Sequence, residues 1–281
     1  MTRALMQLNR ASEIARKEGI KPFLRRASHY LIVRIIWGFK NLLASLISPF
    51  LRDRELCNLN LFEQKIYSQN GEDGILKTVF YKIGTTNKFC VEFGVGGGGE
   101  CNTRYLIEKQ GWNFLQMDSR GKSASSIKKE LITAENVNSI FKKYKVPKQF
   151  DLLSIDIDFN DYWVWQAIQG YSPRVVVIEY NASIPPTRSE VVRYDPHARW
   201  DGTNYFGASL LALEKLGKAK GYTLVACERR GVNAFFVRDD LIKGHFKVRS
   251  ASEIYKPPKY GRMVNFKYVG YPPSRKSMIS V

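Results

Sequence analysis

The sequence predicts an α/β fold built on a mostly parallel, seven-stranded sheet whose last strand is antiparallel. Three observations predict it. Short apolar runs that end in glycine or polar residues alternate with amphipathic segments between residues 67 and 221. One of these runs, Phe89–Phe93, passes directly into the glycine-rich stretch GVGGGG. The last two runs, Tyr222–Cys227 and Asn233–Arg238, flank a short turn and therefore predict a closing antiparallel hairpin.

Length and charge limit the class of protein. The 281 residues suffice for one large α/β domain with appendages, and two full domains are not expected. The net charge of +18 favours an anionic partner, such as a phosphorylated or nucleotide-linked substrate, acidic lipid or nucleic acid, although a basic surface alone also explains it. The four cysteines lack metal-binding spacing, which predicts reduced thiols and a cytoplasmic location.

Three regions are expected along the chain: a basic amphipathic helical arm at residues 1–54, the α/β domain at 55–242 and a basic tail at 243–281. Residues 31–51 of the arm form an apolar pattern with one polar stripe. Arg34 and Lys40 argue against a membrane span. Residues 22–51 then either lie on an anionic membrane surface, peripherally at its inner face, or pack on protein, and a transit peptide is the third reading. The oligomeric state stays open, a homo-oligomer included.

The glycine-rich stretch predicts a nucleotide-type ligand, and charge indicates which one. The spacing Gly94-x-Gly96-x-x-Gly99 fits a dinucleotide loop, but Glu92 and Glu100 would oppose a pyrophosphate at the following helix. An acid at Glu92 followed by glycines at 94, 96 and 98 instead suits S-adenosylmethionine (SAM), which carries an ammonium and a sulfonium.

The next two strands supply further candidate contacts. Asn113–Met117 reads as a strand that ends at Asp118, 24 residues after Gly94, near the spacing of an acid that binds ribose hydroxyls. A plain turn aspartate is the alternative. Ile132–Asn136 is expected to form the tip of the third strand beside the adenine ring, which makes Glu135 a candidate.

Acidic and amide side chains follow two later strands, Leu152–Ile155 and Arg174–Ile178. Asp156 and Asp158 come after the first, and Glu179 and Asn181 after the second. Because parallel strands end at one sheet edge, these four residues are candidate ligands for Mg²⁺ or Mn²⁺. Without an ion, they would hold the cofactor amine, an acceptor hydroxyl or a helix end.

The loop between Tyr180 and Phe206 is rich in aromatic residues and predicts a binding loop for a sugar-like acceptor. A hydroxyl acceptor requires a base, and the candidates are Asp158, Asp156 and His197. A surface role is the alternative for His197.

With these motifs in place, the chain resembles class I SAM-dependent methyltransferases, and within them the FkbM-like group. The similarity runs from about Tyr67 to Asp240, through YSQNGEDGIL, FCVEFGVGGGG, FDLLSIDID, VVVIEYNA and NAFFVRDD. It implies a Rossmann-like methyltransferase sheet in the 55–242 domain. It also implies that the helix before the first strand closes over the methionine end of SAM. The implied cofactor contacts are Gln69, Glu92, Gly94, Gly96, Gly98, Asp118, Glu135 and Asp156.

The resemblance implies methyl transfer to a hydroxyl of a sugar or of a glycan or glycolipid precursor, as in polysaccharide biosynthesis. Two alternatives stay open. One is a nicotinamide-dependent oxidoreductase or epimerase of nucleotide sugars, which the acids around the glycine loop and the closing hairpin disfavour. The other is a non-catalytic, membrane-attached protein with a nucleotide fold. Nucleic-acid methylation is not expected, because neither an NPPY-like tetrapeptide nor an RNA-binding motif is present.

Overall fold

The computed structural model describes residues 55–120 and 126–281. The predicted arm at residues 1–54, with its membrane-surface segment at 22–51, lies outside these ranges and stays a prediction. Within the described residues, no helix is both long and apolar enough to cross a membrane.

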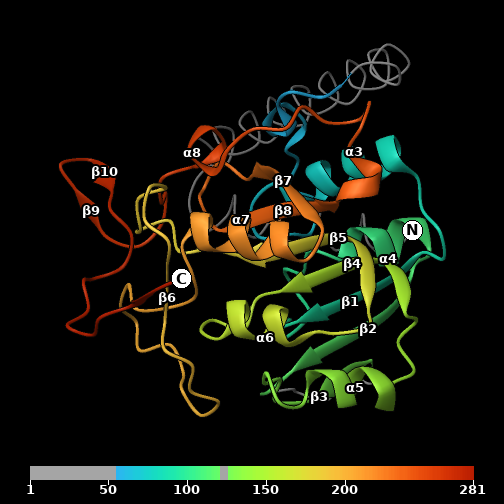
Figure 1. Cartoon of the computed structure of the whole chain (residues 1–281), viewed down its shortest axis with the longest axis horizontal. Coiled ribbons are helices and arrows are strands. Elements are labelled where there is room, and N and C mark those ends of the chain that lie inside the picture. Colours follow the sequence, from blue (N-terminus) through green and yellow to red (C-terminus); the bar gives the residue numbers. More distant parts are fainter. Residues whose placement is uncertain (1–54, 121–125) are drawn as a thin grey trace, which may run out of the picture. The chain divides into compact units, whose positions relative to one another are not determined.

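The core of the fold is a seven-stranded sheet with the order β3-β2-β1-β4-β5-β8-β7 (Figure 1). Its strands are β1 (Phe89–Phe93), β2 (Asn113–Asp118), β3 (Ile127–Lys129), β4 (Gln149–Ile155), β5 (Ser172–Glu179), β7 (Tyr222–Cys227) and β8 (Asn233–Arg238). The first five pair in parallel, whereas β8 runs antiparallel to both β5 and β7. The predicted fold class, including the antiparallel last strand, is confirmed.

Six α-helices and two short 3₁₀ helices accompany the sheet in the described ranges. They are η1 (Leu59–Phe62), α3 (Glu72–Ile83), α4 (Arg104–Gln110), α5 (Val137–Lys143), α6 (Asp161–Ala167), α7 (Leu210–Ala219), η2 (Asp239–Leu241) and α8 (Ala251–Ile254). Gly111 ends α4 with a left-handed φ of 68°, and the Ser209 side chain caps α7.

Alternation along β1 divides the domain into two sides. Val91 and Phe93 face a large core that also holds Phe141 of α5 and Trp165 of α6. The rings of Phe93 and Phe141 lie 5.8 Å apart. Glu92 points to the opposite side, where its carboxylate accepts hydrogen bonds at the start of α4. The polar cluster around Glu92 therefore lies on the side of β1 opposite this core.

The third strand lies earlier than the sequence predicted. Ile127–Lys129 forms β3 and pairs with β2, whereas residues 132–136 are a turn leading into α5. An edge strand of three residues with two exposed lysines has no apolar run to reveal it. The prediction that Ile132–Asn136 forms the tip of the third strand is therefore wrong.

The long loop and the basic tail pair with each other. Strand β6 (Glu190–Val191) lies within the loop and pairs with β11 (Ile279–Ser280) near the end of the chain. Between them, β9 (Met263–Val264) and β10 (Lys267–Tyr268) form a separate hairpin. The tail thus belongs to the same compact unit as the sheet, which continues to Val281.

Candidate active site

The glycine loop brings the ends of β1 and β4 into close contact. Gly94 has a φ of +75°, and a Cβ on it would lie 1.4 Å from the Asp156 carbonyl oxygen. Only glycine fits there, for both conformational and steric reasons. Gly96 and Gly98 also have positive φ, but of these two only Gly98 would bring a Cβ near a neighbour, the Ile127 side chain at 3.1 Å.

Glu92 faces the protein and not a ligand. Its carboxylate is 4% exposed and accepts hydrogen bonds from the Asn102 and Thr103 backbone N–H groups and, at 2.5 Å, from the Thr103 hydroxyl. Burial raises the pKa of this carboxyl, and those hydrogen bonds oppose the rise. The expectation that Glu92 meets the cofactor directly is therefore corrected, because strand alternation turns its side chain toward the start of α4.

Asp118, at the end of β2, connects the loop to a pocket. Its carboxylate accepts a 2.8 Å hydrogen bond from the Gly96 N–H and a 2.7 Å bond from the Arg120 N–H. Each carboxylate oxygen can accept a further hydrogen bond, so Asp118 can still bind hydroxyl groups. This is the position that the sequence predicted for a ribose contact.

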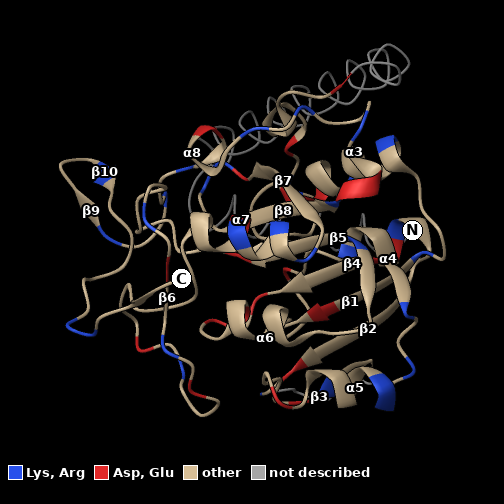
Figure 2. Cartoon of the chain, in the orientation of Figure 1, with Lys and Arg blue, Asp and Glu red and all other residues tan. Residues whose placement is uncertain are grey.

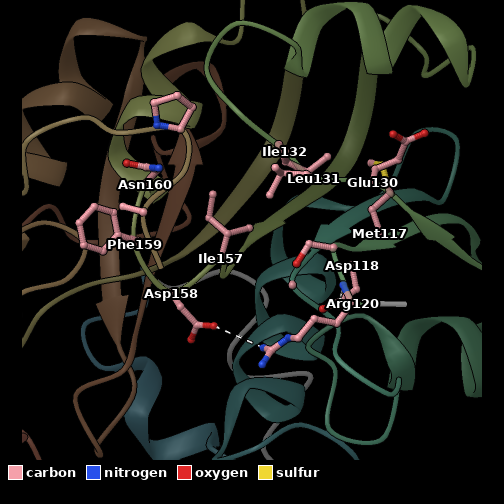
Figure 3. Close-up of a pocket in the computed structure, with 14 residues that line it drawn as sticks. Met117, Asp118, Arg120, Glu130, Leu131, Ile132, Ile157, Asp158, Phe159 and Asn160 are labelled. Carbon is pink, nitrogen blue, oxygen red and sulfur yellow. Dashed lines mark hydrogen bonds and ion pairs between the residues drawn. The ribbon is translucent and has the colours of Figure 1, made fainter. Parts of the chain in front are cut away.

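The pocket lies at the carboxyl ends of β1, β2 and β4 and holds about 560 Å³ of empty space, part of it open to solvent (Figure 3). Its lining consists of Gly94, Met117, Asp118, Ser119, Arg120, Glu130, Leu131, Ile132, Ile157, Asp158, Phe159, Asn160, Pro196 and Ala198. Met117, Leu131, Ile132 and Ile157 contribute apolar side chains to this lining, and Asp118 and Asn160 contribute polar groups. A flat apolar ring with a hydroxylated sugar fits such a lining.

Asn160 adds a polar group that the sequence analysis missed. Its amide nitrogen donates a 2.7 Å hydrogen bond to the Asp195 carbonyl of the long loop. Its Oδ1 is buried and has no partner among the described residues. This oxygen can therefore accept a hydrogen bond from a ligand in the pocket.

Four acids gather where β4 and β5 end: Asp156, Asp158, Asp161 and Glu179. Burial raises the pKa of Asp156 and Glu179 well above their usual range, and the other acids of the group add to the rise. Burial also raises the pKa of Asp161 to about 7. One oxygen of Asp161 and one of Glu179 are buried without a hydrogen-bond partner in the described part of the chain. Such a cluster favours a cation or a proton.

Asp158 lies at the boundary between this cluster and the pocket. Its backbone has a φ of +67°, which is uncommon outside glycine, and its carboxylate lies 3.7 Å from the Arg120 guanidinium. Figure 3 shows this ion pair crossing between the ends of β2 and β4. Figure 2 locates acidic residues on β1 and β2 as well.

Aromatic rings from the loop and the tail border the acids. Tyr271 packs on Trp200, with centroids 4.5 Å apart, and on Phe206 and Tyr260. Burial raises the pKa of Tyr260 and of Tyr271, and in both cases the charge of Glu179 contributes. These two tyrosines lie in the tail, where no sequence pattern indicates a site.

The predicted metal site is not assembled. The described residues contain no group of three or more His, Cys, Asp or Glu side chains that could hold a metal ion. Asn181 is fully buried; its amide donates to the Asn204 and Phe206 carbonyls, and its Oδ1 accepts from the Ser183 N–H. Its assignment as a ligand for Mg²⁺ or Mn²⁺ is corrected, because its polar atoms already hold the long loop. The residues present do not fit the ion.

Three further candidates lie away from the pocket lining. Gln69 is exposed, and its carbonyl accepts a hydrogen bond from Lys65. Glu135 is exposed and accepts a hydrogen bond from the Tyr194 hydroxyl. His197 is exposed too, and its backbone N–H bonds to Asp195. Their neighbours at Leu131, Ile132, Pro196 and Ala198 line the pocket in their place.

The strand order and the antiparallel β8 define a Rossmann-like α/β sheet of the methyltransferase type. No family model matches the sequence, and no curated protein matches it. Among solved structures, the chain is similar to one described as the structure of the citrinin polyketide synthase CMeT domain. The TM-score is 0.30 and the sequence identity 12%, over 62% of this chain and 54% of that chain. The chain thus spans about half the length of that structure.

Proposed function

We propose that this protein is a SAM-dependent methyltransferase that methylates a hydroxyl oxygen of a sugar or of a glycan or glycolipid precursor. One observation carries the proposal: the pocket beside Asp118 adjoins a cluster of buried acids with raised pKa values. A carboxylate that can accept hydrogen bonds from hydroxyl groups and a neighbouring group of acids that favours positive charge would suit the two ends of SAM.

The surroundings of Glu92 disfavour a dinucleotide. A pyrophosphate needs free backbone N–H groups at the helix that follows the glycine loop. Here the N–H groups of Asn102 and Thr103, which precede α4, already donate to the Glu92 carboxylate. A pyrophosphate at the start of α4 would find these N–H groups already bonded and would lie near the buried Glu92 carboxyl. A nicotinamide cofactor is therefore the weaker hypothesis.

The residues of the pocket would hold SAM as follows. Asp118 would accept hydrogen bonds from the ribose hydroxyls, and Leu131, Ile132 and Ile157 would pack on the base. Asp156 and Glu179 would offset the positive charge at the methionine end. SAM, when bound, supplies a methyl group that its sulfonium has already activated.

Asp156 would act on the acceptor. A sugar hydroxyl is a weak nucleophile at neutral pH and needs a base whose pKa lies near the working pH. Burial and the neighbouring acids raise the pKa of Asp156, which makes its carboxylate a stronger base. The ionised form of Asp156 would take the hydroxyl proton, while the rings of Trp200 and Tyr271 offer flat surfaces on which a sugar can stack. This assignment replaces His197, whose side chain is exposed.

Calorimetry on the full chain with SAM and with NADH tests the cofactor. We expect SAM to bind, and Asp118→Ala to weaken it about tenfold or more by removing a charged hydrogen-bond acceptor. Asp240→Ala is the matched control, because it removes an acid that pairs with Arg238 and does not line the pocket. Binding of NADH without binding of SAM would refute the proposal.

Label transfer from methyl-labelled SAM to glycan and glycolipid extracts tests the acceptor. We expect labelled sugar methyl ethers, identified by mass spectrometry of the released sugars. Asp156→Asn should abolish the label even at a SAM concentration that saturates the variant. Label found only on amines or carbon atoms would contradict transfer to oxygen.

A further inference from the structure

The β9–β10 hairpin carries a phenylalanine at a position that favours glycine. Asn265 and Phe266 connect the two strands with φ values of 48° and 60°. Two-residue turns with both φ values positive strongly prefer Asn-Gly, because a bulky residue at positive φ is strained. The Phe266 side chain is 97% exposed, so packing within the protein does not explain its presence.

Other apolar side chains surround Phe266. Ten large hydrophobic residues are exposed among the residues described, and five of them lie between positions 263 and 269. They are Met263, Val264, Phe266, Tyr268 and Val269. A concentration of exposed apolar side chains on one small element marks an interaction site.

The charge around the hairpin is uniformly positive. Residues 254–281 contain six Lys or Arg residues and no Asp or Glu. Arg262 directly precedes β9, and Lys267 begins β10. Figure 2 shows this basic colouring along the β9–β10 region. An apolar tip flanked by basic side chains is suited to the boundary between acyl chains and anionic lipid head groups.

The stem holds the tip in a defined place. The Arg262 N–H donates to the Gly270 carbonyl at 2.8 Å, and the Val269 N–H donates to the Arg262 carbonyl at 3.0 Å. Just outside these bonds, the rings of Tyr260 and Tyr271 lie 5.1 Å apart. Figure 1 shows the hairpin projecting away from the seven-stranded sheet.

From these observations, we infer that the β9–β10 hairpin docks the protein on an anionic lipid bilayer, with Phe266 inserted below the head groups. Arg262 and Lys267 contact the lipid phosphates. The apolar tip favours a bilayer over nucleic acid, whose surface offers phosphates but no apolar layer at that depth. This inference does not depend on the proposed enzymatic activity.

Sedimentation of the full chain with vesicles of 70% phosphatidylcholine and 30% phosphatidylglycerol tests the docking surface. We expect Phe266→Gly to lower the partition coefficient about tenfold, because it removes the aromatic side chain that would insert into the bilayer. Glycine also suits the turn, so the variant retains the hairpin. Leu61→Ser is the matched control, since Leu61 is 73% exposed on η1 and should have no effect. Equal partitioning of wild type and Phe266→Gly would overturn the inference.

A local probe separates the hairpin from any other lipid-binding part of the chain. An environment-sensitive NBD dye is placed on Phe266→Cys in a Cys57→Ser background, because Cys57 is the exposed free cysteine among the described residues. We expect its emission to shift to the blue with anionic vesicles and much less with phosphatidylcholine alone. A blue emission before vesicles are added, or a shift caused by self-association or by oligonucleotide, would overturn the inference.

Discussion

Asp161 allows a direct test of the electrostatics of the acid cluster. Its side chain is fully buried; Oδ1 accepts a 2.8 Å hydrogen bond from the Ile157 N–H. Burial raises its pKa from 3.8 to about 7. The substitution Asp161→Asn keeps the shape and the Oδ1 acceptor but removes the titration. Any pH-dependent difference between the two proteins then reports on the cost of ionising this carboxyl.

The sign follows from proton binding. Between pH 4 and pH 7 the folded state keeps the proton on Asp161, whereas the unfolded state has lost it. The folded state therefore loses stability as pH rises through this window, and the loss is complete above the folded pKa. Each pH unit corresponds to about 1.4 kcal/mol, so roughly 2 to 3 kcal/mol should develop between pH 5 and pH 8 as an upper limit.

Urea unfolding of the ligand-free full chain at pH 5 and pH 8 measures this difference. We expect the stability advantage of Asp161→Asn over wild type to be larger at pH 8 than at pH 5. Asp240→Asn serves as the control, because its ion pair with Arg238 lowers the pKa of that carboxyl, away from this window. A variant whose advantage stays constant or shrinks with rising pH would refute the reasoning about the cluster.

Two further predictions concern the framework of the site, and both are measured by urea unfolding and by the yield of folded protein. Gly94→Ala should prevent normal folding, since its Cβ would lie 1.4 Å from the Asp156 carbonyl oxygen. Gly97→Ala should be tolerated, because a Cβ at Gly97 meets open space and the φ angle there is an ordinary one. Equal folded yields of the two variants would contradict the steric role of Gly94. Asp151→Ala should cost about 3 to 5 kcal/mol, because it leaves the buried Arg174 guanidinium, 3.3 Å away, without its charge partner; a loss below 1 kcal/mol would argue against a buried pair.

The sequence predicted the central strands well because their burial leaves a strong pattern. Leu152, Leu153 and Val175 to Ile178 are fully buried, and runs of this kind are typical of parallel strands covered on both faces. The edge strand Ile127–Lys129 was missed for the opposite reason. With one face and one edge free, it needs only a single buried side chain, Ile127.

The tail was unpredictable for a different physical reason. Strands β9, β10 and β11 have two residues each, too few for alternation to be recognised. The turn that would reveal a hairpin usually reads Asn-Gly, but here it reads Asn-Phe. The contacts that bring Tyr260 and Tyr271 to the acids depend on long-range pairing, which no local pattern encodes.

Glu92 shows how an acid chosen from the sequence for a site can face the protein interior. The sequence reasoning required an acid near a cationic ligand and chose Glu92, because it precedes the glycines. Within a strand, however, alternation decides the direction of a side chain. The Glu92 side chain points toward α4, where its carboxylate accepts hydrogen bonds from Asn102 and Thr103. Asp156 follows the end of β4, and burial and the neighbouring acids raise its pKa. A positively charged ligand beside Asp156 would favour its ionised form, so an acid that can respond to a ligand lies just beyond the strand end and not within the strand.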